Sequence, residues 1–170
     1  MRPWLALSTT VSAALFAGAL TANAGATELR LEVAIPRMAV AEYHAPYLAF
    51  WLKHADSGEI VPLGLWYDDQ EKWLKDLRLW WRRTGRGQSR PYDGLTGATR
   101  RPGTHSVDFS ELPALSDLPE GDYQLVVEAA REVGGREVVR LPFQWPATGN
   151  KTVRADGEQE LGRVQLRLAP

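Results

Sequence analysis

The alternation of apolar and polar residues predicts short β-strands along most of the chain. Residues 28–35 alternate with the two-residue period of a half-buried strand. Aromatic and β-branched runs of similar length lie at residues 47–53, 60–67, 104–109, 122–130, 136–145 and 161–168. Two of the links between these runs, residues 54–58 and the Gly134-Gly135 pair, are typical of hairpins.

Seven short strands separated by turn signals predict an all-β fold, an immunoglobulin-like antiparallel β-sandwich. The paired cysteines of true immunoglobulin domains are absent. Pro119, Gly121 and Tyr123 have a Pro-x-Gly-x-Tyr spacing that resembles the turn opening a late strand in many bacterial immunoglobulin-like modules. The chain shows no internal repeat, so we expect a single domain over residues 25–170, with residues 147–159 as a polar connection before the last strand.

One segment, residues 70–83, departs from the strand period. Its apolar residues fall at i, i+1, i+4, i+7 and i+8, which is the stripe of an amphipathic helix. These residues are Trp73, Leu74, Leu77, Trp80 and Trp81. Asp68 and Glu71 predict a capping-box-like start, while Arg82 and Arg83 suit the negative end of a helix dipole. We expect one inserted helix and, after it, a long functional loop over residues 84–103.

The first 24 residues are typical of a cleaved signal peptide. Arg2 precedes an apolar run at residues 5–20, and Ala22-Asn23-Ala24 is an Ala-x-Ala cleavage site. Hydroxyl residues interrupt the run and no basic stop-transfer flank follows it, which disfavours a transmembrane segment. We therefore expect a periplasmic protein without direct membrane insertion.

The amino-acid composition excludes several kinds of site and partner. The chain has no cysteine, which excludes disulfides, thiolate metal ligands and a thiol nucleophile. A formal net charge of −1 gives no indication of a nucleic-acid partner. His44, His54 and His105 lack a ligand-like spacing, so no metal site is expected. The seven tryptophans indicate a thick core, a ligand-stacking surface, or both, and we assign Trp66 and Trp73 to the core.

The heptapeptide Asp93-Gly94-Leu95-Thr96-Gly97-Ala98-Thr99 lies in the long loop. Its Asp-Gly and Thr-Gly pairs are typical of an ordinary surface turn. The pattern Asp-x-x-Ser/Thr-Gly-Ala-Thr also resembles the acceptor motif recognised by FAD:protein FMN transferases, and it is matched here without substitution. The match covers these seven residues alone. The rest of the chain does not resemble the α+β FMN-binding domains of sodium-pumping and Rnf-type complexes.

The resemblance implies a covalent FMN on Thr99. The threonine hydroxyl would be joined to the FMN phosphate, with FAD as the donor and AMP as the leaving group. Asp93 and Thr96 occupy the acidic and first hydroxyl positions of the motif, and the small Gly97 and Ala98 allow the backbone to approach a pyrophosphate closely. Such an acceptor must reach into another enzyme, which calls for an exposed, flexible loop.

Positive charge flanks the motif in the sequence. The arginines are Arg83, Arg86, Arg90, Arg100 and Arg101. Guanidinium groups match phosphate oxygens, which makes Arg100 a candidate phosphodiester contact, although a solvated basic loop is an equally simple interpretation. Trp80, Trp81 and Tyr92 are candidates to stack on an isoalloxazine ring, but the helical spacing of the two tryptophans favours the core.

Most of the remaining chain resembles a family of predicted periplasmic proteins of unassigned function. The stretches that carry this resemblance are residues 44–47, 72–77, 96–103 and 128–132. The resemblance implies association with flavin transferases and with PepSY-type membrane reductases, often in iron acquisition.

Together these observations favour a periplasmic electron carrier, in which the protein positions and tunes a flavin that does the redox chemistry, rather than a stand-alone enzyme. The alternative is a cofactor-free binding or scaffold module whose tryptophans line a peptide or ligand surface. The sequence contains no nucleophile elbow of a Ser/His/Asp hydrolase.

Overall fold

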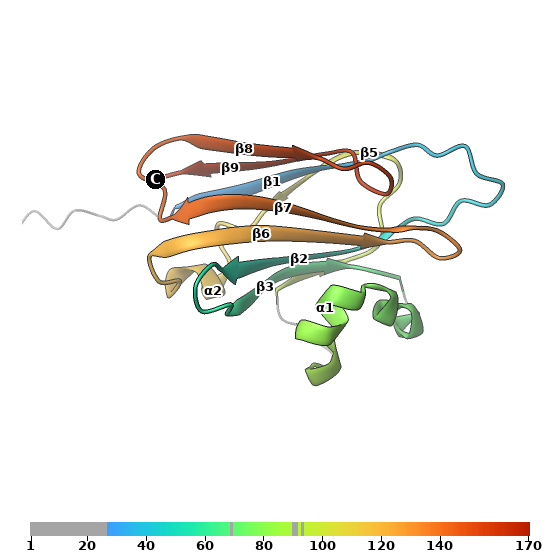
Figure 1. The fold of residues 1–170 in the computed structure, drawn as a ribbon, viewed down its shortest axis with the longest axis horizontal. Helices are drawn as coiled ribbons and strands as arrows, with labels where there is room; N and C mark the ends of the chain where they lie inside the picture. Colours follow the sequence, from blue (N-terminus) through green and yellow to red (C-terminus); the bar gives the residue numbers. More distant parts are fainter. Residues whose placement is uncertain (1–26, 69, 90–91, 93) are drawn as a thin grey trace, which may run out of the picture.

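Two β-sheets face each other across one main core (Figure 1). The structure is a computed structural model that describes residues 27–68, 70–89, 92 and 94–170; the expected signal peptide lies outside these residues. The four-stranded sheet has the order β5-β1-β9-β8, and the five-stranded sheet has the order β4-β3-β2-β6-β7. Every pairing is antiparallel except that of β3 with β4.

All seven predicted strands are confirmed to within two residues at either end. They are β1 (Glu28–Ile35), β2 (Tyr47–His54), β3 (Ile60–Trp66), β5 (Gly103–Asp108), β6 (Gly121–Ala130), β7 (Arg136–Trp145) and β9 (Arg163–Ala169). Both predicted hairpins are also present, since β2 pairs with β3 and β6 pairs with β7. The expected β-sandwich architecture is therefore correct at the level of two packed sheets.

The prediction of a polar connection over residues 147–159 is wrong. Lys151–Asp156 forms β8, which pairs antiparallel with β9 at the edge of the four-stranded sheet. Its residues alternate between exposed and half-buried, and only Val153 and Ala155 pack against the core. An edge strand with one solvated face needs few apolar residues, so its sequence carries a weak strand signal.

The main core lies between the sheets. Alternate residues of each strand point into it, as the two-residue period requires, and its largest fully buried side chains include Phe50 and Phe109. At the start of β6, the Tyr123 hydroxyl donates a hydrogen bond to the Pro119 carbonyl oxygen at 2.9 Å. This bond ties the strand to the turn that precedes it. A short helix, α2 (Pro113–Ser116), lies in the connection from β5 to β6.

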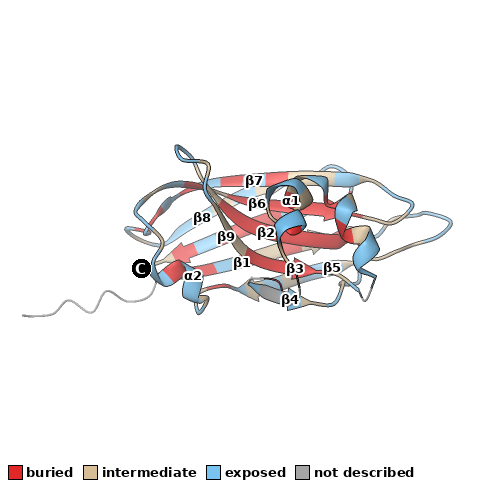
Figure 2. Cartoon of the chain, turned by 90° about the horizontal axis from the view of Figure 1, so that it is seen from below, coloured by how far each residue is buried: buried red, intermediate tan, exposed pale blue. Residues whose placement is uncertain are grey.

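A second apolar cluster covers the outer face of the five-stranded sheet. Strand β2 is buried on both sides: Leu48 and Phe50 face the main core, and Ala49 and Trp51 face outward. Helical turns of residues 71–83 lie over that outer face (Figures 1 and 2). Apolar residues on these turns, Leu74, Leu77 and Trp80, complete the cluster.

The single helix expected over residues 70–83 is wrong, although its apolar face is placed as predicted. A 3-10 helix, η1 (Glu71–Asp76), is followed by the α-helix α1 (Arg78–Arg83), and Leu77 between them has a non-helical ψ of 69°. The capping box is also wrong, because Gln70 stands at the N-cap without a side-chain cap and Asp68 accepts the Gln70 N–H instead. Glu128, a side chain of the sheet, stabilises this break by accepting the N–H groups of Leu79 and Trp80.

The structureless loop expected over residues 84–103 is wrong in part. A 3-10 turn, η2 (Gly85–Gly87), and a strand, β4 (Leu95–Gly97), lie within it. Strand β4 pairs parallel with β3, so the loop is attached to the sheet at its middle. Three residues are too few to show a period, which explains why the sequence did not predict this strand.

Candidate functional site

The motif runs along one open edge of the sandwich. Strand β4 is the edge strand of the five-stranded sheet, and β5 is the edge strand of the four-stranded sheet. Residues 98–102 connect the two, and the Tyr67 N–H donates to the Gly97 carbonyl oxygen at 2.9 Å. The expectation that the whole motif is a free loop is therefore wrong, because residues 95–97 form β4 while Ala98 and Thr99 follow it in the crossing segment.

Glycine is required at position 94. Its φ is +91°, a region that side chains disfavour, and a Cβ there would lie 2.6 Å from the carbonyl carbon of Leu63. The chain thus passes close against β3 as it enters β4. Asp93, the acidic residue of the motif, lies outside the described residues.

The Thr99 side chain is partly exposed. Thr99 is half-buried, its neighbours Ala98 and Arg100 are exposed, and Thr96 is exposed on the edge strand. Within the described part of the chain, the Thr99 hydroxyl forms no hydrogen bond. Gly97 and Ala98 before it present no bulky side chain, so a partner could reach the hydroxyl from the edge of the sandwich.

Arg100 lies over the indole ring of Trp66. The guanidinium carbon is 5.3 Å from the ring centroid, a cation–π distance. A Cβ at Gly97 would lie 3.6 Å from Cδ1 of Trp66 and 3.8 Å from Nη2 of Arg100, so these three residues are neighbours. Trp66 is only 5% exposed, which confirms its assignment to the core, yet one side of its ring also supports the motif.

Behind this pair, Trp66 packs edge-on against Phe50 at 5.0 Å and against His105 at 5.9 Å. The His105 Nε2 atom lies 2.8 Å from the carbonyl oxygen of Arg101. The segment of residues 98–102 is therefore held at Arg100 and Arg101, the two residues that follow Thr99. The sequence did not identify Trp66 or His105 as neighbours of the motif, because they come from β3 and β5.

Two of the three proposed stacking aromatics are buried. Trp80 is 3% exposed, Tyr92 is 9% exposed, and their rings meet edge-on at 5.7 Å. The core assignment of Trp80 is confirmed, and neither ring has a free face for a flavin. Trp81 is half-buried, and so is Trp73, which packs against the outer cluster. Of the flanking arginines, Arg83 and Arg86 are exposed on α1 and η2, and Arg90 lies outside the described residues.

A buried carboxylate from the sheet caps α1. Glu128 on β6 is fully buried and accepts the backbone N–H groups of Leu79 at 2.9 Å and Trp80 at 2.7 Å, together with Arg136 Nε at 2.6 Å. The first N–H groups of a helix have no partner within the helix, and a negative charge suits that end of its dipole. Glu128 therefore stabilises the break at Leu77. The sequence signal that could have identified this contact is the single Glu within the apolar run of β6.

Two more carboxylates, Glu160 and Glu137, connect the β6–β7 hairpin to residues 158–161. Glu160 accepts Arg131 Nε at 3.0 Å and the Gly135 N–H at 2.7 Å. Glu137 accepts four backbone N–H groups of residues 158–161. Burial pushes the pKa of Glu137 upward, but these N–H groups outweigh burial and hold the pKa below its usual value. These contacts attach the β6–β7 hairpin to the segment of residues 158–161.

Neither a metal centre nor a membrane span was found in the described residues. No group of three or more His, Cys, Asp or Glu residues could hold a metal ion. Among the same residues, no helix is both long and apolar enough to cross a bilayer.

Comparison with known proteins gives one match. No curated protein and no solved structure matches the chain. A family model described as a predicted periplasmic protein matches residues 28–163, which include every strand except β9, of which only the first residue, Arg163, is covered. This match confirms the periplasmic localisation expected from the sequence. The chain belongs to the DUF2271 family of predicted periplasmic proteins.

Proposed function

We propose that this protein carries FMN covalently on Thr99 and works as a periplasmic electron carrier. A FAD:protein FMN transferase attaches the flavin, and a PepSY-type membrane reductase supplies its electrons in an iron-acquisition pathway. In the attachment step the Thr99 oxygen forms a bond to the flavin-side phosphorus of FAD, the anhydride bond breaks, AMP leaves, and the hydroxyl proton passes to solvent. Asp93, Thr96, Gly97 and Ala98 serve as recognition residues for the transferase.

The observation that carries the proposal is the position of Thr99. Thr99 is partly exposed, and its hydroxyl has no hydrogen-bond partner among the described residues. It follows a short strand that holds the middle of the motif on the sheet. A transferase must bind the acceptor backbone and reach one hydroxyl. An edge strand followed by small residues suits that need, because an edge strand offers unpaired backbone groups to a partner.

We infer that Arg100 contacts the phosphodiester. It is adjacent to Thr99, exposed, and has no carboxylate within ion-pair distance in the described part of the chain. Its contact with Trp66 restricts the guanidinium without neutralising it. A fixed, unneutralised arginine beside the acceptor stabilises the two phosphate oxygens of the ester and the negative charge of the reduced flavin.

We also propose that the scaffold is immunoglobulin-like. The order β3-β2-β6-β7 has the neighbour relations of strands C′, C, F and G, and the β5–β1 pair corresponds to E and B. The Tyr123 bond to Pro119 has the geometry of the tyrosine corner at the start of strand F. The last strand, β9, pairs with β1 where strand A would stand.

The test is the intact mass of the mature protein after periplasmic co-expression with a FAD:protein FMN transferase. We expect a gain of one FMN less one water, and a yellow protein whose flavin resists denaturation. Thr99→Ala should abolish the gain while melting like the parent. Thr152→Ala, which removes an exposed threonine hydroxyl from β8, is the matched control and should gain the flavin like the parent. An unchanged mass with an active transferase and FAD present would refute the flavin and leave the cofactor-free binding or scaffold module.

A second measurement addresses Arg100. Arg100→Ala should lower flavin occupancy or shift the flavin reduction potential to a more negative value, because a positive charge beside the flavin favours its reduced anion. Its melting temperature should stay close to that of the parent. Arg163→Ala, at an exposed arginine of β9, is the control for loss of charge alone. Equal occupancy and equal potential for both variants would contradict the role given to Arg100.

A further inference from the structure

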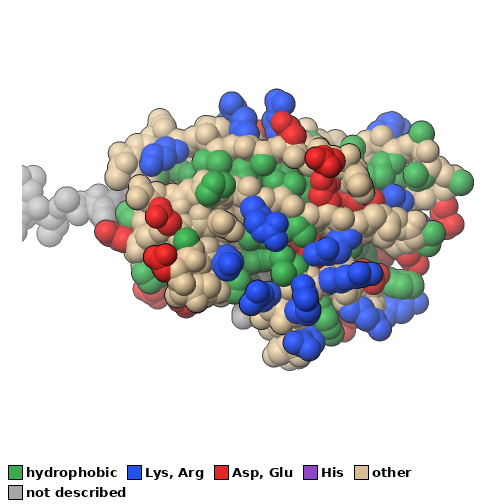
Figure 3. All heavy atoms as spheres, viewed as in Figure 1, with side chains coloured by type: hydrophobic (Ala, Val, Ile, Leu, Met, Phe, Trp, Pro, Cys, Tyr) green, Lys and Arg blue, Asp and Glu red, His purple; other side chains and the backbone are tan. Residues whose placement is uncertain are grey.

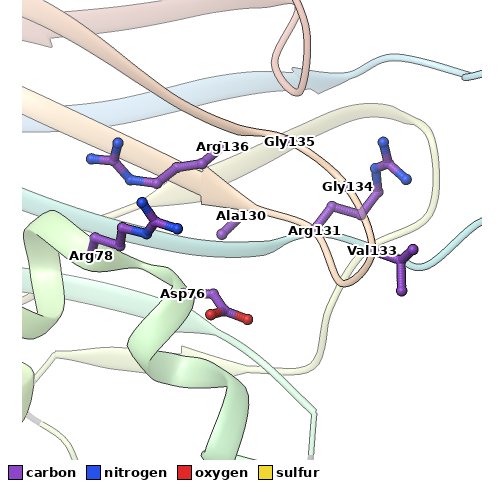
Figure 4. Close-up of a pocket in the computed structure, with 8 residues that line it drawn as sticks. All are labelled: Asp76, Arg78, Ala130, Arg131, Val133, Gly134, Gly135 and Arg136. Carbon is purple, nitrogen blue, oxygen red and sulfur yellow. The ribbon is translucent and has the colours of Figure 1, made fainter.

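A basic hollow lies between α1 and the β6–β7 hairpin, on the face of the sheet away from the main core. Figure 4 shows Arg78 extending from the helical segment toward the strand that carries Arg136. The hollow has a volume of about 380 Å³, and a second one of about 440 Å³ adjoins it. Both are lined by Arg78 and Arg136, so the two hollows are adjacent, and together they are called the groove below.

The groove carries unneutralised positive charge. Arg131 is paired with Glu160 and Arg136 with Glu128. The other cations of the lining, Lys75, Arg78 and Arg82, have no carboxylate within ion-pair distance among the described residues. The one lining carboxylate is Asp76, which leaves a surplus of two positive charges. Figure 3 shows Lys and Arg side chains gathered over the α1 region.

An aromatic ring stands beside these cations. Trp81 lines the second hollow together with Lys75, Arg78, Arg82 and Arg136. The ring is held from behind, because a Cβ at Gly85 would lie 2.8 Å from Cε3 of Trp81 and because Trp80 packs against it at 6.2 Å. Half-buried and fixed in this way, Trp81 offers a surface for stacking a planar group.

The groove is also pre-organised. The Glu128 carboxylate binds Arg136 and, at the same time, the backbone N–H groups of Leu79 and Trp80. One buried side chain therefore sets the position of α1, with Arg78 and Trp81, relative to β7. Binding sites whose groups are held before the ligand arrives lose less entropy on binding.

We propose that this groove binds a phosphate monoester joined to a planar ring, the class to which nucleoside monophosphates belong. Above its second pKa of about 6, a phosphate monoester carries close to two negative charges, which matches the surplus of the groove. The guanidinium groups of Arg78 and Arg82 bind the phosphate oxygens, and the ring stacks on Trp81. The site is separate from Thr99 and does not depend on a flavin there.

The experiment is isothermal titration of AMP into the mature protein, purified without a transferase, in low salt at pH 7.5. We expect binding that is at least tenfold tighter than that of adenosine, which lacks the phosphate, or of inorganic phosphate, which lacks the ring. At pH 5, where the phosphate holds a second proton, the affinity should fall several-fold. Thr99→Ala should bind AMP like the parent, which separates this site from the proposed flavin site.

Variants assign the contacts. Arg78→Ala should weaken AMP and inorganic phosphate at least tenfold, while Trp81→Leu should weaken AMP and leave phosphate unchanged. Arg163→Ala is the control, since it removes an exposed arginine from the other sheet. The proposal is overturned if AMP gives no heat at millimolar concentration, or if Arg78→Ala binds AMP as tightly as the control does. Equal affinity for AMP and inorganic phosphate would overturn the stacking role of Trp81.

Discussion

Removal of the Glu128 carboxylate should destabilise the protein more than any change of a surface charge. The side chain is fully buried and accepts three hydrogen bonds, two from the first turn of α1 and one from Arg136. In Glu128→Ala the two N–H groups lose their partner inside the apolar cluster, and Arg136 loses its counter-ion. Each of these groups then has to find water or remain unpaired.

The expected loss of stability in Glu128→Ala follows from these three hydrogen-bond partners. A hydrogen bond to a charged group contributes about 1.5–3 kcal/mol, and breaking a buried ion pair costs about 3–5 kcal/mol. The Arg136 side chain is 35% exposed, so water recovers part of its loss. We therefore expect Glu128→Ala to lower the free energy of unfolding by about 4 kcal/mol, which is roughly 12 °C in melting temperature for a domain of this size. Glu128→Gln keeps one acceptor oxygen and should lose about 2 kcal/mol.

Urea denaturation followed by tryptophan fluorescence measures both losses. Glu111→Ala is the control, because Glu111 is exposed, and it should stay within about 0.5 kcal/mol of the parent. Since Glu128 also positions Arg78 and Trp81, the Gln variant should bind AMP more weakly than the parent while still folded. A Glu128→Ala protein within about 1 kcal/mol of the parent would refute the reasoning that the carboxylate holds α1 on the sheet.

Three further changes test other parts of the fold by the same denaturation assay. Leu77→Ala should cost about 3 kcal/mol, since the side chain is fully buried, and a loss below about 1 kcal/mol would place η1 and α1 off the sheet. Gly94→Ala should cost about 2 kcal/mol because of its φ of +91° and the nearby Leu63 carbonyl, and an unchanged stability would contradict this backbone geometry. Glu137 has a lowered pKa when folded, so its contribution is present above the unfolded pKa of about 4.3 and is lost as pH falls through the folded pKa. The stability difference between Glu137→Gln and the parent should thus be full at pH 7 and vanish in strong acid, and a constant difference across that range would be inconsistent with the four N–H contacts.

The sequence by itself determined the strands of the core and the face of the helical segment. A strand with one buried face must alternate, so β1 and β7 could be predicted with their exact ends. The helical stripe likewise predicted that Leu74, Leu77 and Trp80 are buried. Both signals are local, because they come from the repeat of the backbone itself. The motif that identifies Thr99 as the acceptor is also a local signal, because it consists of seven consecutive residues.

Contacts between segments far apart in the sequence decided the features that the sequence did not predict. The helix breaks at Leu77 because Glu128, on another strand, supplies the partner for the freed N–H groups. Strand β8 is polar, and its hydrogen bonds come from β9 rather than from any apolar period of its own.

The surroundings of Thr99 were decided in the same way. Trp66 contacts Arg100 because β4 pairs with β3. Strand β4 has only three residues, which is too few for a repeating pattern that would predict this pairing. A repeat along the chain can show which side of an element faces the core. It cannot show which distant group completes a hydrogen bond or covers a ring, since that depends on where the folded sheets bring the two together.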